Sequence, residues 1–169
     1  KENASEHLNE NTQSFITLLS DEILVEDIPA DLNGDGKDDK IITAKKLSDQ
    51  FIYFLLFLQD PETQTFTRAA EIKTEAAHAK TLSVYTLAVH ECERPLIVYN
   101  GMNADAQQVF GIYELTITQD NAVQSQSLVS IQADGQIILK SGNNNSITSC
   151  KISAYYSDSD APNTLNQIE

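Results

Sequence analysis

Positive charge is scarce in this chain of 169 residues, which has 11 Lys and Arg against 25 Asp and Glu and a formal net charge of −14. A nucleic-acid binder needs a basic surface that displaces the counterions of the phosphates. An anionic membrane also repels a protein of this sign unless a cation bridges the two. The composition therefore predicts that the chain binds neither nucleic acid nor a bare anionic membrane.

Long apolar runs are also missing, because the longest, Phe51 to Leu58, has eight residues, whereas a membrane-spanning helix needs about 20. Eight residues is the length of a strand. The chain starts with polar residues and without an initiator Met, so we expect a trimmed or mature fragment whose targeting segment has been removed. With 41% apolar residues, the chain can bury a core, with one compact domain as the default and two small ones as the alternative.

Cysteine is rare too, and the two that are present, Cys92 and Cys150, lie 58 positions apart without a C-x-x-C spacing. A zinc ribbon or a thioredoxin-type site therefore has no support. The two either form a disulfide or are ordinary buried thiols, and the sequence leaves both alternatives open. A disulfide closing so long a loop would stabilise the fold by about 4 kcal/mol in the chain-entropy model, and would place the protein outside the cytosol.

A helical rhythm is confined to residues 4–20, where Leu8, Phe15, Ile16 and Leu19 recur near i, i+7, i+8 and i+11 between polar residues. This spacing predicts an amphipathic N-terminal helix that packs one stripe against a core. We assign residues 1–24 to this helix and the lead into the first strand. Residues 25–157 form the expected β domain, and residues 158–169 an acidic C-terminal tail.

From about residue 23 onward, short apolar or alternating runs are separated by turn residues, a pattern typical of a mainly β chain. Many short strands at close spacing predict antiparallel sheets arranged as propeller-like blades, a sandwich or a barrel. Similar apolar stretches at 41–45, 96–100 and 137–141 are explained either by a blade-length repeat or by the likeness of buried strands. The expected strands are 41–42, 51–59, 82–89, 96–99, 109–118, 137–139 and 147–156, and the expected turns are 60–61, 100–101, 120–121, 134–135 and 141–143.

The segment from Asp31 to Asp39, DLNGDGKDD, carries the clearest chemical signal in the chain. Side-chain oxygens of Asp31, Asn33, Asp35 and Asp39 occupy positions 1, 3, 5 and 9, and the Lys37 carbonyl at position 7 would add a backbone oxygen. Ca²⁺ takes six to eight oxygen ligands, whereas Mg²⁺ gives up its water reluctantly. Eight acidic residues and one Lys lie between positions 21 and 39, so this segment repels itself without a counterion. A solvated acidic turn is the alternative, since Asn-Gly and Asp-Gly favour turns by themselves.

The residue at position 12 of this loop separates the known kinds of calcium loop. An EF-hand needs a bidentate Glu there and helices on both sides, and a dockerin-type loop needs an acid there. Position 12 is Ile42, inside an apolar run, so both are excluded. The stretch from Asp31 to Ile42 instead resembles the calcium loop and following strand of FG-GAP/VCBS repeats, the blades of integrin-like β-propellers, with a fainter similarity over about residues 25–70.

The resemblance implies a secreted or surface location, one structural Ca²⁺ held by the loop, and blades that work in sets of several. A chain of 169 residues is too short for six or seven blades of about 45 residues each. We therefore expect either additional blades, supplied by the rest of a larger protein or by a partner chain, or a compact β domain that keeps one such loop.

Two weaker motifs add little. The stretch from His90 to Arg94 begins like H-E-x-x-H, but Arg94 stands where the second zinc-binding His must be and Pro95 follows, so a zinc peptidase has no support. Asn103 and Asp105 belong either to a degenerate second calcium loop or to an ordinary turn.

The sequence thus predicts a non-catalytic, calcium-binding β domain that is secreted, periplasmic or surface-anchored. It would act as a binding, adhesion or scaffold module for a protein or carbohydrate ligand. No catalytic residue is assigned. The alternative is a hydrolase, or an accessory domain of a secreted enzyme, for which His90, Glu91 and Glu93 would be the first candidates.

Overall fold

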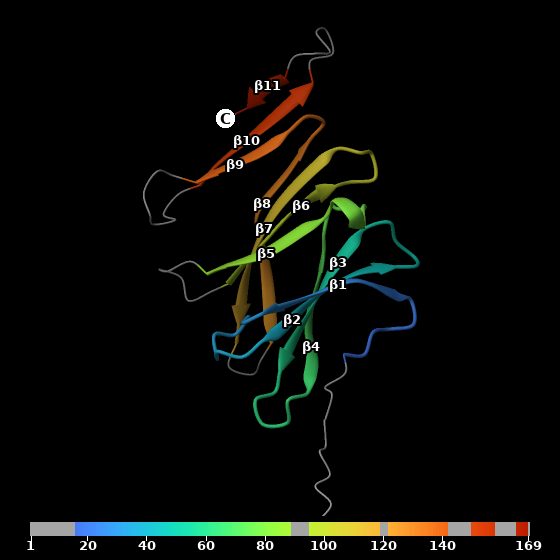
Figure 1. Ribbon diagram of the computed structural model, residues 1–169, viewed down its shortest axis with the longest axis vertical. Helices are drawn as coiled ribbons and strands as arrows, with labels where there is room; N and C mark the ends of the chain where they lie inside the picture. Colours follow the sequence, from blue (N-terminus) through green and yellow to red (C-terminus); the bar gives the residue numbers. More distant parts are fainter. Residues whose placement is uncertain (1–15, 89–94, 119–121, 142–149, 158–164, 169) are drawn as a thin grey trace, which may run out of the picture.

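Three antiparallel sheets make up the chain in the computed structural model, which describes residues 16–88, 95–118, 122–141, 150–157 and 165–168 (Figure 1). The first and second sheets are four-stranded meanders that follow chain order, and the short 3-10 helix η1 (Ala79–Thr81) lies between them. The third sheet has the order β11-β10-β9. The strands are β1 (Glu22–Ala30), β2 (Asp39–Lys46), β3 (Ile52–Gln59) and β4 (Phe66–Lys73); β5 (Ser83–Ala88), β6 (Pro95–Met102), β7 (Gln108–Ile117) and β8 (Val123–Ala133); and β9 (Ile137–Ser141), β10 (Cys150–Ser157) and β11 (Leu165–Ile168).

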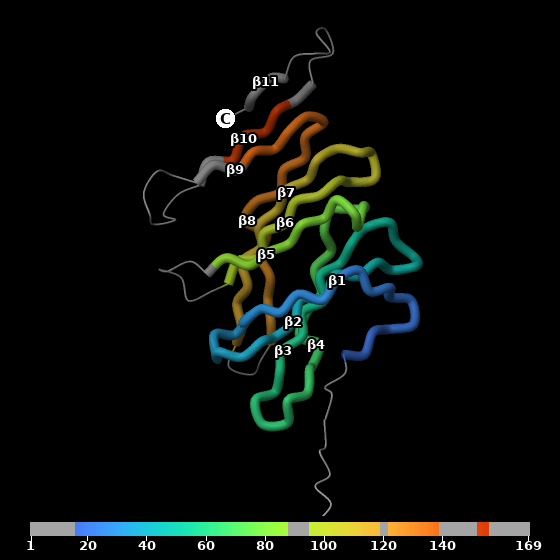
Figure 2. Tube along the Cα trace, in the orientation of Figure 1, coloured from blue at the N-terminus to red at the C-terminus, as the bar shows by residue number. Residues whose placement is uncertain are grey.

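The sheets follow one another along the long axis, with the first sheet at one end and the third at the other (Figure 2). One apolar cluster joins the first sheet to the second, and it includes Phe54 of β3 and Tyr99 of β6, whose rings meet edge to face at 5.5 Å. Another cluster lies on the opposite face of the second sheet, where Val98 and Phe110 are accompanied by Ile137 and Ile152 of the third. The prediction of a mainly β chain with antiparallel sheets is confirmed.

Burial on both faces explains the long apolar run at the centre of the first sheet. Ile52, Phe54, Leu56 and Leu58 contribute to the cluster against the second sheet. The alternate residues of β3 form a separate cluster on the outer face, together with side chains of β2 and of the chain before β1. Because successive side chains of a strand point to opposite faces, a strand covered on both sides has apolar residues at every position.

The predicted N-terminal helix is wrong where the structure describes it. Residues 16–19 are coil and residues 20–21 form a turn, while residues 1–15 lie outside the described part. Ile16 and Leu18 are half-buried against the outer face of the first sheet, and Thr17 and Leu19 are exposed. This alternation has the period of an extended chain rather than a helix. Ile16 therefore packs on the core as predicted, but it does so from an extended segment and not from a helix.

Two further expectations need correction. The predicted turn at Asn100 and Gly101 is part of β6, where these residues pair with Phe110 and Val109. A Cβ on Gly101 would lie 3.3 Å from the Cβ of Ala76, so this glycine allows a close approach between segments rather than a turn. Residues 165–168 of the predicted acidic tail form β11, which pairs with β10. Among the described residues, no helix is long and apolar enough to cross a membrane.

Tyr99 fixes the spacing between the first two sheets. Its side chain is 1% exposed, and its ring stacks on Tyr113 at a centroid distance of 6.0 Å. Burial raises the pKa of Tyr99 above its usual range. A Cβ added to Gly111, the residue that pairs with Tyr99 across β6 and β7, would lie 2.1 Å from Cε1 of the ring. The ring therefore occupies the space that any side chain at position 111 would need.

Gly111→Ala should destabilise the fold by about 2 kcal/mol or more, because the methyl group must displace a fully packed ring. The free energy of unfolding from urea titration checks this value. Gly101→Ala is the matched control, since its Cβ makes a much milder contact, and it should cost less. Equal effects of the two substitutions would contradict the role of the Tyr99 ring.

Ion pairs surround the apolar outer face of the first sheet. The side chain of Glu22 is fully buried and accepts hydrogen bonds from Arg68 Nη1 at 2.9 and 3.1 Å and from the backbone N–H of Leu19 at 2.9 Å. Burial opposes ionisation of Glu22, but these hydrogen bonds and the charges of Arg68 and Lys46 outweigh it and lower the pKa of Glu22. Arg68 also pairs with Glu71, so one guanidinium holds two carboxylates on this face.

Arg68→Met should cost about 2 kcal/mol at neutral pH, because it leaves a buried carboxylate without its cation. Since the pKa of Glu22 is lowered, the pair stabilises the fold above the ordinary Glu pKa of about 4.3, and this contribution is lost as the pH falls through the lowered value. Urea titrations between pH 7 and pH 3 measure the effect. The double variant Glu22→Gln/Arg68→Met should recover part of the stability at pH 7; a double variant as unstable as the sum of the singles would contradict the coupling.

Candidate metal centre

The loop between β1 and β2 holds four of the predicted ligands in a tight turn. Asp31 accepts hydrogen bonds from the N–H groups of Gly34 (2.7 Å, to Oδ1) and Gly36 (3.0 Å, to Oδ2). Asn33 Oδ1 accepts from the N–H of Asp35 at 3.0 Å, and its Nδ2 donates to Asp35 Oδ2 at 3.2 Å. These bonds curl the loop around its own side-chain oxygens, so the short polar side chains set its shape.

Two glycines allow the backbone to adopt the conformation of this tight turn. Gly34 and Gly36 both have φ of +78°, a region that residues with a Cβ rarely adopt. A Cβ at either position would meet nothing within 4 Å. Glycine is therefore required here by the backbone conformation and not by lack of space.

Asp39 has a different environment from the rest of the loop. It is 0% exposed. Its Oδ2 accepts a hydrogen bond from the backbone N–H of Leu32 at 3.0 Å, and its Oδ1 accepts one from the N–H of Gln59 at 2.8 Å. One carboxylate thus ties the start of the loop to the end of β3, 20 residues along the chain. Leu32 itself is 1% exposed and belongs to the core cluster, which anchors the loop from below.

The charge of Asp39 is poorly compensated. Burial raises the pKa of Asp39, and the nearby carboxylate of Asp35 adds to this rise, although the hydrogen bonds from Gln59 and Leu32 oppose it. Among the described residues, no Lys, Arg or His forms an ion pair with Asp39. A buried carboxylate without a counterion costs free energy, and a bound cation would remove that cost.

Lys37 and a neighbouring depression complete the surroundings. The side chain of Lys37 points away from the ligand set and donates from Nζ to the carbonyl of Pro61 at 2.9 Å. A shallow, open depression of about 400 Å³ adjoins the loop and reaches the end of β7. It is lined by Asn33, Asp35, Leu58, Gln59, Pro61, Ile117 and Thr118.

The structure brings the predicted ligands into one loop but does not converge their carboxylates on one point. Within the described residues, no group of three or more His, Cys, Asp or Glu side chains is arranged to hold a metal ion. Asp31 and Asp35 turn toward the loop's own N–H groups, and Asp39 turns toward the interior. Each carboxylate oxygen has two lone pairs, so an oxygen that accepts an N–H can also ligate a cation. The donor chemistry suits Ca²⁺, although the carboxylates of Asp31, Asp35 and Asp39 are not gathered around one point.

The other candidate residues from the sequence lie either outside the described residues or in an ordinary turn. His90, Glu91, Glu93 and Cys92 lie outside the described residues, and so does any contact between Cys92 and Cys150. Asn103, predicted to belong to a second loop or a turn, is 7% exposed, and its Oδ1 accepts from the N–H groups of Asp105 and Gln107. This turn joins the second and third strands of its sheet, whereas the loop at 31–39 joins the first and second.

Sequence reasoning missed the partners that anchor the site. Gln59 and Leu32 give backbone N–H groups to Asp39, and no local pattern marks a backbone donor 20 residues away. Ile117 and Thr118 reach the depression only because the second sheet stacks on the first. The sequence contains one indirect indication of this anchoring. Asp39 stands at the start of β2, just before its apolar run, a position from which its side chain can point into the core.

Comparisons with known proteins give no match to a protein-family model, to a curated protein or to a solved structure. The similarity to FG-GAP/VCBS repeats therefore rests on the loop motif and the strand that follows it.

Asp39→Ala should destabilise the protein by about 3 kcal/mol even in EGTA, because it leaves the N–H groups of Leu32 and Gln59 without an acceptor. Asp38→Ala is the matched control: the residue is adjacent, equally charged and exposed, so its substitution should change stability by less than about 0.5 kcal/mol. Urea titration of both variants in EGTA separates this anchoring role from metal binding. Similar losses for the two variants would refute it.

Proposed function

We propose that the chain is a non-catalytic, extracytoplasmic binding or adhesion module in which the loop 31–39 holds a structural Ca²⁺. The observation that carries the proposal is the buried carboxylate of Asp39, which accepts two backbone hydrogen bonds but has no ion-pair partner among the described residues, at the base of a loop rich in oxygen donors. Two more carboxylates, those of Asp31 and Asp35, lie on the exposed part of the same loop. Three carboxylates, an amide oxygen and a carbonyl form a hard donor set that suits Ca²⁺.

Each residue of the loop would have a separate role toward the ion. Asp39 would provide the fixed ligand, since both of its oxygens are already oriented by backbone donors. Asp31, Asn33 and Asp35 would supply the mobile ligands, and Lys37 its carbonyl. The ion would supply the positive charge that this acidic segment lacks. Its effect would be to tie the β1–β2 connection to the end of β3.

The arrangement of sheets agrees with a propeller-blade-like organisation. The first two sheets are four-stranded meanders stacked face to face, and the third continues the stack. Further blades from the rest of a larger protein, or from a partner chain, would extend it. The hydrolase alternative has no supporting observation among the described residues, since its candidates fall in residues 89–94, outside that part.

The proposed extracytoplasmic location suits a calcium site of low affinity. Calcium sites of extracellular modules bind with dissociation constants of about 10⁻⁴ to 10⁻³ M. Loading at these values needs the calcium concentrations found outside the cytoplasm. The surface presented around the ion, including the depression beside Asn33 and Asp35, would then be available to a protein or carbohydrate ligand.

Calcium should raise the melting temperature. With 5 mM CaCl₂ and a dissociation constant of about 0.1 mM, linkage gives about 2 kcal/mol, or roughly 5 °C for a domain of this size. Thermal unfolding followed by circular dichroism in CaCl₂ and in EGTA measures the shift. Asp35→Ala should abolish the difference, because it removes a ligand.

Asp38→Ala serves as the matched control here too, since it removes the same charge from an exposed neighbouring position that is not in the ligand set. It should keep the calcium-dependent shift. Identical melting curves of the unsubstituted protein with and without calcium would overturn the proposal. So would equal losses of the shift in both variants, which would indicate a general effect of charge.

A further inference from the structure

Four exposed apolar side chains gather where β1 begins. Leu19, Ile23, Leu24 and Leu47 are 59%, 53%, 54% and 70% exposed, and they are four of the five large apolar side chains that are exposed in the described part of the chain. The N–H of Leu47 donates to the carbonyl of Asp21 at 2.8 Å, and Ile23 and Leu24 face Lys45 and Ala44 of β2. We call this group the β1 corner. Ile23 and Leu24 are successive residues of β1 and so point to opposite faces of the sheet, which means that a partner meets both of them only by covering the edge itself.

The β1 corner lies on an open sheet edge. In the order β1-β2-β3-β4, β1 pairs only with β2 among the described strands. An edge strand offers unpaired N–H and C=O groups to an added strand. A bulge after Leu24 divides the β1–β2 register into residues 22–24, which include the exposed Ile23 and Leu24, and residues 26–30, where Pro29 has no N–H to offer.

The acidic residues around the β1 corner indicate which kind of partner it suits. Asp21 and Glu22 precede the apolar residues Ile23 to Val25, and Glu26 and Asp27 follow them. If β1 of a second copy paired antiparallel with Leu24 opposite Leu24, the two acidic pairs would face each other, and like charges opposite one another are destabilising. Arg68 and Lys40 pair with Glu22 and Asp27, while Asp21 and Glu26 form no ion pair among the described residues. Complementarity therefore favours a basic partner.

We propose that the β1 corner binds an extended segment of a partner protein in which apolar residues are flanked by Lys or Arg. The apolar side chains of the segment cover the corner, its backbone extends the edge of the first sheet, and its cations meet Asp21 and Glu26. Another edge strand, β8, provides the contrast: its exposed residues are mostly Gln and Ser, with Leu128 as the one exposed large apolar side chain.

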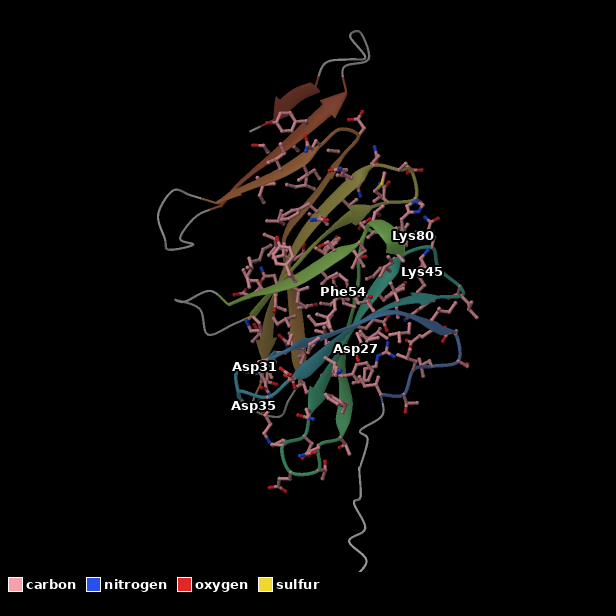
Figure 3. The ribbon with its side chains drawn as sticks, in the orientation of Figure 1. Asp27, Asp31, Asp35, Lys45, Phe54 and Lys80 are labelled. Atoms are coloured by element: carbon pink, nitrogen blue, oxygen red, sulfur yellow. The ribbon has the colours of Figure 1, made fainter. Side chains whose placement is uncertain are left out.

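The corner is separate from the candidate metal centre. Figure 3 shows Asp31 and Asp35 at one end of the β1–β2 hairpin and Lys45, the residue opposite Ile23, at the other. The inference adds a class of partner to the proposed binding role and rests on that role, but it does not depend on calcium.

Fluorescence anisotropy with labelled, end-capped peptides tests the proposal. KKVIVKK should bind the intact protein, EEVIVEE should not, and KKVPVKK, with equal charge but a proline that cannot join a strand, should bind about tenfold more weakly or not at all. Equal binding of KKVIVKK and KKVPVKK would show that charge alone attracts the peptide and would overturn the proposal, as would the absence of binding by KKVIVKK.

Variants then locate the site. Ile23→Thr/Leu24→Thr places β-branched residues, which suit a strand, at both positions and should weaken KKVIVKK binding about tenfold. Leu128→Thr on β8 is the matched control and should leave binding unchanged; an equal loss in both variants would refute the assignment.

Sedimentation of the protein alone tests whether a second copy occupies the corner instead. A dimer that dissociates in the double variant would show that the partner is a second copy, and would overturn the proposal of a basic partner. Binding measured in EGTA supports the corner whether or not calcium shifts the melting temperature, so the two proposals fail separately.

Discussion

The contact of the Tyr99 ring with the backbone of Gly111 sets the geometry on which the candidate site depends. The ring lies between the first two sheets, meets Phe54 edge to face and stacks on Tyr113, so it holds β3 against β6 and β7. With the other face of β3 also covered, this strand has little freedom to shift. Its last residue, Gln59, donates its N–H to Asp39. The packing of the core thus fixes the one buried carboxylate of the loop.

The loop 31–39 combines one rigid acid with several adjustable ones. Asp39 is buried and doubly hydrogen-bonded, whereas Asp31 and Asp35 are exposed and accept hydrogen bonds from the loop itself. A carboxylate with a fixed position loses little conformational entropy when it binds an ion, while exposed ones can turn to complete the ligand shell. If the loop binds an ion as proposed, Asp39 would supply a fixed ligand and the exposed carboxylates would supply adjustable ones. The burial of Asp39 without an ion-pair partner among the described residues is the electrostatic reason for that proposal.

Local patterns predicted the strands with continuous apolar character, and non-local contacts account for what they missed. The runs in β3, β6 and β7 stand out because both faces of these strands are buried. β8 escaped prediction because its exposed residues are mostly Gln and Ser. Asn100 and Gly101 were predicted as a turn because Asn-Gly is a common turn dipeptide, whereas Gly101 lies in β6 and allows a close contact with Ala76. Ile16 has apolar neighbours at helical spacing, yet it packs as part of an extended segment. The ligand residues of the loop were predictable from spacing, but the donors from Leu32 and Gln59 depend on the folded arrangement.

Both proposed sites lie on β1, which begins at the β1 corner and ends at the loop. Glu26, the nearer of the two acidic residues of the corner, lies five residues before Asp31, or about 16 Å at about 3.3 Å per residue, whereas charges are screened over about 8 Å at physiological ionic strength. An ion in the loop therefore cannot act on the acidic residues of the corner through space. Any coupling must pass through the paired strands β1 and β2, whose register is broken by the bulge after Leu24. Glu26 lies on the loop side of the bulge and Asp21 on the far side, so the two acidic residues of the corner are connected to the loop differently. If the loop binds calcium as proposed, the ion would stabilise one end of this hairpin, and the edge proposed to bind a partner lies at the other end.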